Sequence, residues 1–169
     1  HCPSNAFYYA RELTFHGRWI DAIVALNKYL DNPEANWPNE RCYAMRLLAQ
    51  AYERLGDPQG AEQWLNRATK EAPNTREPWV EMSDLSRRMS NWEQSYNCAI
   101  AALDIKDKAL VYTMDPAVWG SEQHDLLAIA AYNLGNYDIA VKHGKIACEI
   151  EPDNDRLKNN LSFYLDKTG

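Results

Sequence analysis

Few residues of this chain have the types and spacing that chemistry requires, and an Asp-x-Asp string is the first candidate. Asp153, Asn154 and Asp155 bring two carboxylates close together in the chain, and hard oxygen ligands of this kind suit Mg²⁺ or Mn²⁺. The string directly follows Pro152 and precedes a predicted helix, where Asp and Asn are preferred N-caps. We therefore expect it to cap a helix, and we predict no metal and no cofactor for the chain.

A histidine–aspartate pair is the second candidate. His124 and Asp125 are adjacent, and His143 lies on the next predicted helix, so a His/Asp pair could act as a general base. We expect His124 to be a buried structural histidine, because it holds a repeat position usually filled by a large core residue, and we expect His143 to lie near it across the hairpin. The sequence offers no third ligand at a metal-binding spacing, no Gly-rich phosphate loop, no nucleophile elbow and no H-E-x-x-H string. It therefore predicts that this chain is not an enzyme.

The elements that would position these residues form a repeat. Gly135 and Asn136 predict a tight turn, and Ala140 and Ala147 lie two turns apart on one face of the following helix. A turn followed by a small residue recurs along the chain, with the small residue at positions 22, 61, 95 and 140. A hairpin with such a face buries its apolar side only when copies stack against it. The predicted helices span about 4–15, 19–30, 40–55, 58–71, 76–89, 92–105, 121–134, 137–150 and 154–166.

Length, composition and charge limit the function classes. The 169 residues predict one domain, and no apolar run reaches the ~20 residues that a membrane span needs. A net charge of −6 argues against a nucleic-acid partner, which would require a basic stripe. The four cysteines form no C-x-x-C pair, which favours a reducing, cytoplasmic compartment. The chain begins without methionine, and residues 7–10 already have the character of a helix interior. We therefore expect a segment of a longer protein, with a mature N-terminus left by processing as the alternative.

The repeat resembles the tetratricopeptide family. In that family a small residue at the turn is followed by two alanines seven residues apart and by a proline, as in Gly56, Ala61, Ala68 and Pro73. The spacing of 34 between positions 61 and 95 is the family's period. The resemblance implies an all-α, right-handed α-solenoid of four helical hairpins plus a C-terminal capping helix, in one domain of residues 1–169. The predicted repeats span about 3–36, 40–74, 76–107 and 121–153, and the capping helix about 154–166.

The resemblance also implies a binding face, because the first helices of tetratricopeptide hairpins line a concave groove. Arg46 and Gln50 lie one turn apart and could hold a carboxylate by charge-assisted hydrogen bonds; a solvated charged face is the alternative. The Lys/Asn carboxylate clamp of peptide-binding members does not occur at the matching positions. The groove candidates are Arg11, Arg46, Gln50, Glu53, Asp84, Arg87, Arg88, Asp125 and Asn159.

Two long connections, about 31–38 and 107–120, carry large aromatic residues. Trp37 lies in the first, and Tyr112 and Trp119 lie in the second. Exposed indoles stack on sugar rings or anchor protein partners. For both tryptophans, inward packing and a partner contact stay open as alternatives.

A narrower resemblance is carried by short strings that occur in one order along the chain. They are Phe7–Leu13 with Gly17–Trp19, Trp37–Arg41, Arg76–Trp79, Tyr112 with Asp115, Pro116, Trp119 and Gly120, then His124–Leu126, and Arg156 and Leu157 with Asn160 and Leu161. These strings look like the helical-repeat tail that follows the catalytic domain in some bacterial and phage family 2 glycosyltransferases. The resemblance implies a parent enzyme that transfers sugar from a nucleotide donor, with this chain as its non-catalytic C-terminal part.

The predicted function is accordingly a protein-interaction or scaffold module. Its predicted partner is a protein or peptide, or the chain's own catalytic domain, and a homo-oligomer is a further candidate. Two alternatives stay open at this stage: a free-standing adaptor with no enzyme attached, and a module that binds a carbohydrate acceptor through the loop tryptophans.

Overall fold

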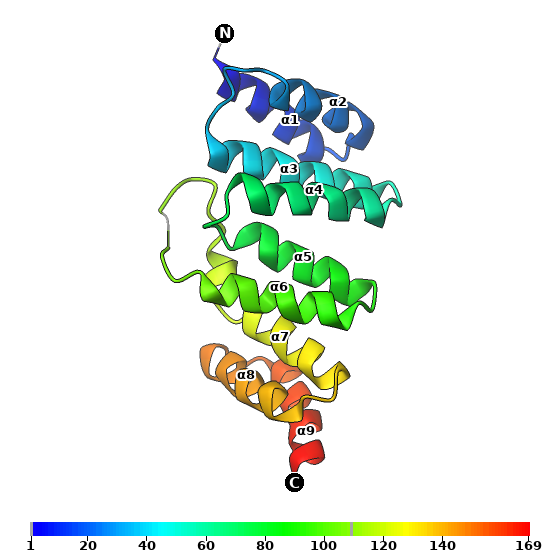
Figure 1. Ribbon diagram of the computed structural model, residues 1–169, viewed down its shortest axis with the longest axis vertical. Coiled ribbons are helices and arrows are strands. Elements are labelled where there is room, and N and C mark those ends of the chain that lie inside the picture. The colour runs from blue at the N-terminus through cyan, green and yellow to red at the C-terminus, as the bar shows by residue number, and fades with distance from the viewer. Residues whose placement is uncertain (1, 109) are drawn as a thin grey trace. The chain divides into compact units, whose positions relative to one another are not determined.

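The computed structural model describes residues 2–108 and 110–169, and these residues form helices without any strand (Figure 1). The predicted all-α class is therefore confirmed. Every predicted helix is present in this described part, with ends within two residues of the prediction. The helices are α1 (Pro3–Phe15), α2 (Trp19–Leu30), α3 (Pro38–Arg54), α4 (Pro58–Glu71), α5 (Glu77–Arg88), α6 (Trp92–Asp104), the 3-10 helix η1 (Pro116–Trp119), α7 (Glu122–Asn133), α8 (Tyr137–Ile150) and α9 (Asp155–Thr168).

The helices form two compact units, His1–Asn74 and Thr75–Gly169, which we call unit 1 and unit 2. In unit 1, α1 pairs with α2 and α3 pairs with α4, and α3 also packs against the first hairpin. The centre of this unit is fully buried and includes Phe7, Leu26 and Leu48. None of the helices in the described part of the chain combines the length and apolarity needed to cross a membrane.

Unit 2 contains two hairpins and the final helix. Its larger cluster joins α5, α6 and α7 through Val80, Ala99 and Leu127. A second cluster joins α7, α8 and α9, where the Tyr164 ring lies so close to Gly144 that a Cβ at this glycine would come within 2.9 Å of it. Gly144 of α8 thus leaves room for α9 to pack closely, as expected for a capping helix.

The four hairpin turns share one local structure. Gly17, Gly56 and Gly135 have φ values of 68°, 85° and 80°, and Ser90 has φ 57°. In each turn the next backbone N–H donates to the carbonyl five residues before it, as from Asn91 to Ser86 at 2.8 Å. This is the Schellman helix ending, in which a left-handed residue reverses the chain. The turn pattern of the sequence is confirmed, including its serine version.

Ser90 pays a conformational cost that glycine would not. We expect Ser90→Gly to raise the free energy of unfolding by about 0.5–1 kcal/mol, because the left-handed strain of about 1–2 kcal/mol is removed and part of it is offset by greater freedom of the unfolded chain. Urea denaturation followed by circular dichroism measures the change. The reverse substitution in the same unit, Gly135→Ser, should destabilise by a similar amount; equal stability of all three proteins would contradict this account.

The small residue after each turn lies where the two helices of a hairpin approach each other. Ala22, Ala61, Ser95 and Ala140 are all buried. Ser95 departs from alanine because it exchanges hydrogen bonds with the facing helix. Its Oγ donates to the carbonyl of Ser83 at 2.9 Å, and the Ser83 Oγ donates to the carbonyl of Ser95 at 2.7 Å. Each buried hydroxyl therefore has an acceptor.

Candidate functional site

The Asp-x-Asp string caps a helix, as predicted. Asn154 is the N-cap of α9, and its Oδ1 accepts a hydrogen bond from the backbone N–H of Leu157 at 3.3 Å. Asp153 and Asp155 are exposed. Across residues 2–108 and 110–169, no group of three or more His, Cys, Asp or Glu side chains is arranged to hold a metal ion.

His124 and His143 face each other across the α7–α8 hairpin, so the predicted contact is confirmed. His124 is half-buried, so the prediction of a buried core histidine was wrong. Their Nδ1 atoms lie 3.0 Å apart. The ring centroids are 5.3 Å apart and the ring planes differ by only 18°. This centroid separation is close to the N···N distance plus the two ring radii, so the rings meet end to end rather than face to face. One imidazole therefore donates its Nδ1–H to the Nδ1 lone pair of the other.

The environment of this histidine pair favours its neutral form. Burial lowers the pKa of His124, and the charges of Arg76 and Lys106 lower it further. Burial, His124 and Lys142 together lower the pKa of His143 to about 4. Because a second added proton would have to replace the lone pair that accepts the hydrogen bond, the two rings cannot both become charged while the bond persists. The pair is a structural contact that responds to pH.

Two of the groove candidates of unit 1, Arg11 and Arg46, lie over aromatic rings. The guanidinium carbon of Arg11 is 5.0 Å from the centroid of the Tyr8 ring, and that of Arg46 is 5.1 Å from the Tyr43 ring. The buried Phe7 ring lies between these two tyrosines, with centroid distances of 5.7 Å and 5.4 Å. We call this set of five side chains, from α1 and α3, the arginine–aromatic row. It holds two positive charges on the first helices of unit 1, each over a ring face that attracts cations.

The other unit 1 candidates lie along α3, C-terminal to Arg46. Gln50 is exposed one turn beyond Arg46, and Glu53 is half-buried. Arg11 also lies 5.5 Å from the centroid of the exposed Phe15 ring. Its Nε is buried and has no hydrogen-bond partner within the described residues. A buried donor without an acceptor is uncommon in folded proteins.

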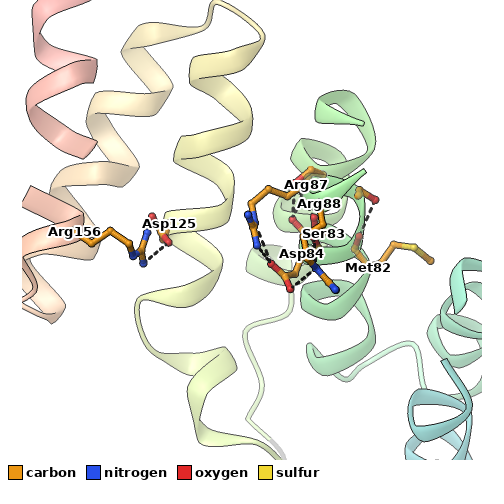
Figure 2. A network of polar contacts seen from close by, with 9 residues as sticks. Met82, Ser83, Asp84, Arg87, Arg88, Asp125 and Arg156 are labelled. Atoms are coloured by element: carbon orange, nitrogen blue, oxygen red, sulfur yellow. Dashed lines mark hydrogen bonds and ion pairs between the residues drawn. The ribbon is translucent and has the colours of Figure 1, made fainter. Parts of the chain in front are cut away.

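Most groove candidates of unit 2 form ion pairs, either with one another or with Arg156, which was not a predicted groove residue (Figure 2). Asp84 contacts Arg87 at 2.8 Å and Arg88 at 3.3 Å, both within α5. Asp125 on α7 contacts Arg156 on α9 at 2.8 Å. Asn159 is exposed on α9. The groove prediction covers both units and stays a prediction.

The loop tryptophans differ in their surroundings. The indole of Trp119 lies under the Arg76 guanidinium, whose carbon is 3.8 Å from the ring centroid. Arg76 is only 7% exposed, and it donates to the carbonyl of Ile105 from Nε and Nη2 and to that of Val118 from Nη1. Trp37 and Tyr112, by contrast, are exposed. Trp119 therefore contributes to holding the long connection against α5.

Arg41 plays the same part in unit 1. Its Nη1 donates to the carbonyls of Leu30 and Ala35, both at 3.0 Å, and its Nε lies 2.7 Å from a carboxylate oxygen of Glu71. Thus a single arginine at the start of a first helix anchors each long connection. Neither Arg41 nor Arg76 was among the predicted site residues. Arg41 follows the connection that it holds, whereas Arg76 lies 29 positions before Ile105, so its role has no local signal in the sequence.

Comparisons with known proteins agree with this geometry. Residues 44–85 match the family model described as tetratricopeptide repeat. The fold is a tetratricopeptide-like α-solenoid. Similar solved structures include "Crystal structure of MamA protein", with a TM-score of 0.76 and 16% identity over 99% of this chain and 83% of that one. "MamA 41-end from Desulfovibrio magneticus RS-1" has a TM-score of 0.77 and 14% identity over 99% of this chain and 86% of that one. No curated protein sequence matches the chain.

Proposed function

We propose that this chain is a non-catalytic protein-interaction scaffold that binds an acidic segment of a partner protein on the first helices of unit 1. The observation that carries the proposal is the arginine–aromatic row. Two guanidinium groups, of the half-buried Arg11 and Arg46, are held over tyrosine rings of α1 and α3. Tetratricopeptide-like folds present their first helices for binding, and this fold offers those two charges there.

The stacking on rings matters because it reduces the cost of binding. A free arginine side chain loses about 2 kcal/mol of rotamer entropy when it is fixed, whereas a stacked guanidinium is already oriented. Carboxylates accept paired N–H bonds from such a group. The exposed Gln50 amide, one turn from Arg46, adds a further donor on the same helix.

The unit 2 candidates are a separate part of the proposal. Asp84, Arg87 and Arg88 are paired within α5, and Asp125 is paired with Arg156. We assign the acidic segment to Arg11 and Arg46 of unit 1, because both guanidinium groups lie over tyrosine rings. The unit 2 groups and Asn159 stay candidates for a contact on unit 2 alone.

A fluorescein-labelled peptide rich in Glu and Asp, titrated with the protein and followed by anisotropy, tests the proposal. We expect the double variant Arg11→Ala/Arg46→Ala to bind at least about tenfold more weakly, since two charge-assisted contacts are lost. The matched control is Arg67→Ala on α4, because Arg67 also lies over a ring, 4.1 Å from Trp64, but on a second helix. Absence of binding by the native chain, or an equal loss in the control, would contradict the proposal.

A finer proposal concerns the parent protein. The ordered short strings that resemble the tail of family 2 glycosyltransferases support the chain's being the C-terminal part of such an enzyme, with its own catalytic domain as a partner. The test is the reading frame upstream of His1. About 200–300 residues of alternating strands and helices with an Asp-x-Asp at a strand end would support it, whereas a start codon directly before His1 would refute it. None of the four cysteines forms a disulfide within the described residues, which is in keeping with a cytoplasmic location, and that location stays part of this proposal.

A further inference from the structure

The first hairpin exposes a position of its first helix that is buried in α3 and α7. Tyr9 directly precedes the small residue of its first helix, as do Leu48 in α3 and Leu127 in α7. Leu48 and Leu127 are 0% exposed, because the preceding hairpin of the same unit packs over them, but Tyr9 is 61% exposed. A large apolar ring therefore lies on the outer side of α1.

The second helix of this hairpin extends the open face. Ile20 and Val24, two residues before and two after the small Ala22, are 69% and 66% exposed. In the other three hairpins the same two positions carry polar residues in every case. These polar residues are Gln59 and Gln63, Glu93 and Asn97, and Asp138 and Lys142. The other three hairpins therefore carry residues suited to water at these two positions, and only the first of the four hairpins carries apolar residues there.

The two helices form one continuous surface at this face. Ile20, Val24 and Lys28 follow one another at intervals of four, so they make a single stripe along α2. Lys28 and Tyr9 both line a cavity of about 500 Å³ between α1 and α2. We call Tyr9, Ile20, Val24 and Lys28 the first-hairpin face. An apolar stripe beside a hollow is the shape that another helix fills.

The charges at the two ends of α2 indicate which partner binds to the first-hairpin face. Asp21 lies in the first turn and Lys28 in the last turn. When two α2 helices pair antiparallel about a twofold axis at Val24, Lys28 of each comes beside Asp21 of the partner subunit and the helix dipoles oppose. We propose that the first-hairpin face is the interface of a symmetric dimer formed by two copies of this chain.

The size of the face predicts a weak dimer. Tyr9, Ile20 and Val24 together expose roughly 350 Å² in each copy, which is less than half of the area that one partner contributes to a standard stable interface. A dissociation constant in the micromolar to sub-millimolar range is therefore expected. The copies should associate at high concentration and separate on dilution.

Sedimentation equilibrium of the chain between about 10 µM and 1 mM tests the proposal. We expect dimer formation in the native protein and at least tenfold weaker association in Ile20→Gln/Val24→Gln, which gives α2 the residues that α4 carries at the same positions. Phe163→Gln on α9 is the control, since Phe163 is similarly exposed at 62% but lies outside the face. A monomer at every concentration, or a dimer that the double variant leaves unchanged, would overturn the proposal.

A charge exchange distinguishes this twofold pairing from other contacts of the same face. Lys28→Glu alone and Asp21→Lys alone should each weaken association by about fivefold or more, because each places like charges opposite one another. The combined variant should recover most of the loss. Asp21 also pairs with Arg18, the N-cap residue of α2, at 2.7 Å, so circular dichroism must show unchanged helix content in each variant. Additive losses without recovery would refute the antiparallel arrangement.

Discussion

Replacing Arg76 by alanine is expected to lower the free energy of unfolding of unit 2 by about 3 kcal/mol. The guanidinium donates three hydrogen bonds to the carbonyls of Ile105 and Val118, at the two ends of the long connection between α6 and α7. It also covers the Trp119 ring. Each charge-assisted bond contributes about 1.5–3 kcal/mol in mutational series, and its loss leaves a carbonyl without its donor. Urea denaturation followed by circular dichroism gives the change.

Two further substitutions show whether the fork geometry of Arg76 is responsible. Arg76→Lys keeps the charge but lacks the planar fork that directs separate N–H groups at the two carbonyls, so we expect it to lose about 1–2 kcal/mol. Arg87→Ala, which removes a half-exposed pair with Asp84, should change stability by less than about 1 kcal/mol. If Arg76→Ala were no more harmful than Arg87→Ala, the anchoring role would be wrong.

The helical hairpins could be predicted because their signals are local. Gly56 and Ala61 mark a turn and a close helix contact within six positions, and both physical requirements are met by the residue type alone. Ser90 and Ser95 fit the same pattern because serine tolerates the left-handed turn at a moderate cost and stays small enough for the helix crossing. Helix ends followed from Pro58 and Asn154, which favour a first turn and an N-cap.

The anchors of the long connections could not be predicted in the same way. Arg76 reaches carbonyls at positions 105 and 118, and no periodicity in the sequence encodes such a contact. Whether an arginine at a helix start faces water or a folded-back loop depends on the path of that loop. The sequence left the orientation of Trp119 open for this reason, and the partner of the indole came only from the fold.

The predicted binding residues were predictable in part: their helices could be predicted from the sequence, but not all of their contacts. The repeat register placed Arg11, Arg46, Asp84 and Asp125 on first helices, which the structure bears out. It did not reveal that the two arginines belong to one row, because Tyr8 and Tyr43 meet only through Phe7 across two helices. The contact of each arginine with the tyrosine three positions before it was predictable from that spacing. The pairs of Asp84 with Arg87 and Arg88 were predictable from their spacings of three and four.

Acidification is expected to destabilise unit 2 through the histidine pair, by on the order of 2 kcal/mol between pH 7 and pH 4. His143 has a pKa of about 4 in the folded chain, against about 6.5 when unfolded. Between these values the unfolded chain binds more protons than the folded chain, so stability is fully present above pH 6.5 and is lost as pH falls. The lowered pKa of His124 acts in the same direction.

The variant His124→Gln/His143→Gln isolates this contribution, because two amides can hydrogen-bond across the same hairpin without titrating. Urea denaturation of the variant and the native chain at steps from pH 7 to pH 4.5 should show the native free energy of unfolding falling by on the order of 2 kcal/mol relative to that of the variant, since carboxylates titrate alike in both proteins. His16→Gln is the matched control, as His16 is exposed at the end of α1 and should leave the native pH dependence unchanged. Parallel curves for native protein and double variant would show that the pair is not neutral in the folded state, and the end-to-end hydrogen bond would then have to carry a shared positive charge.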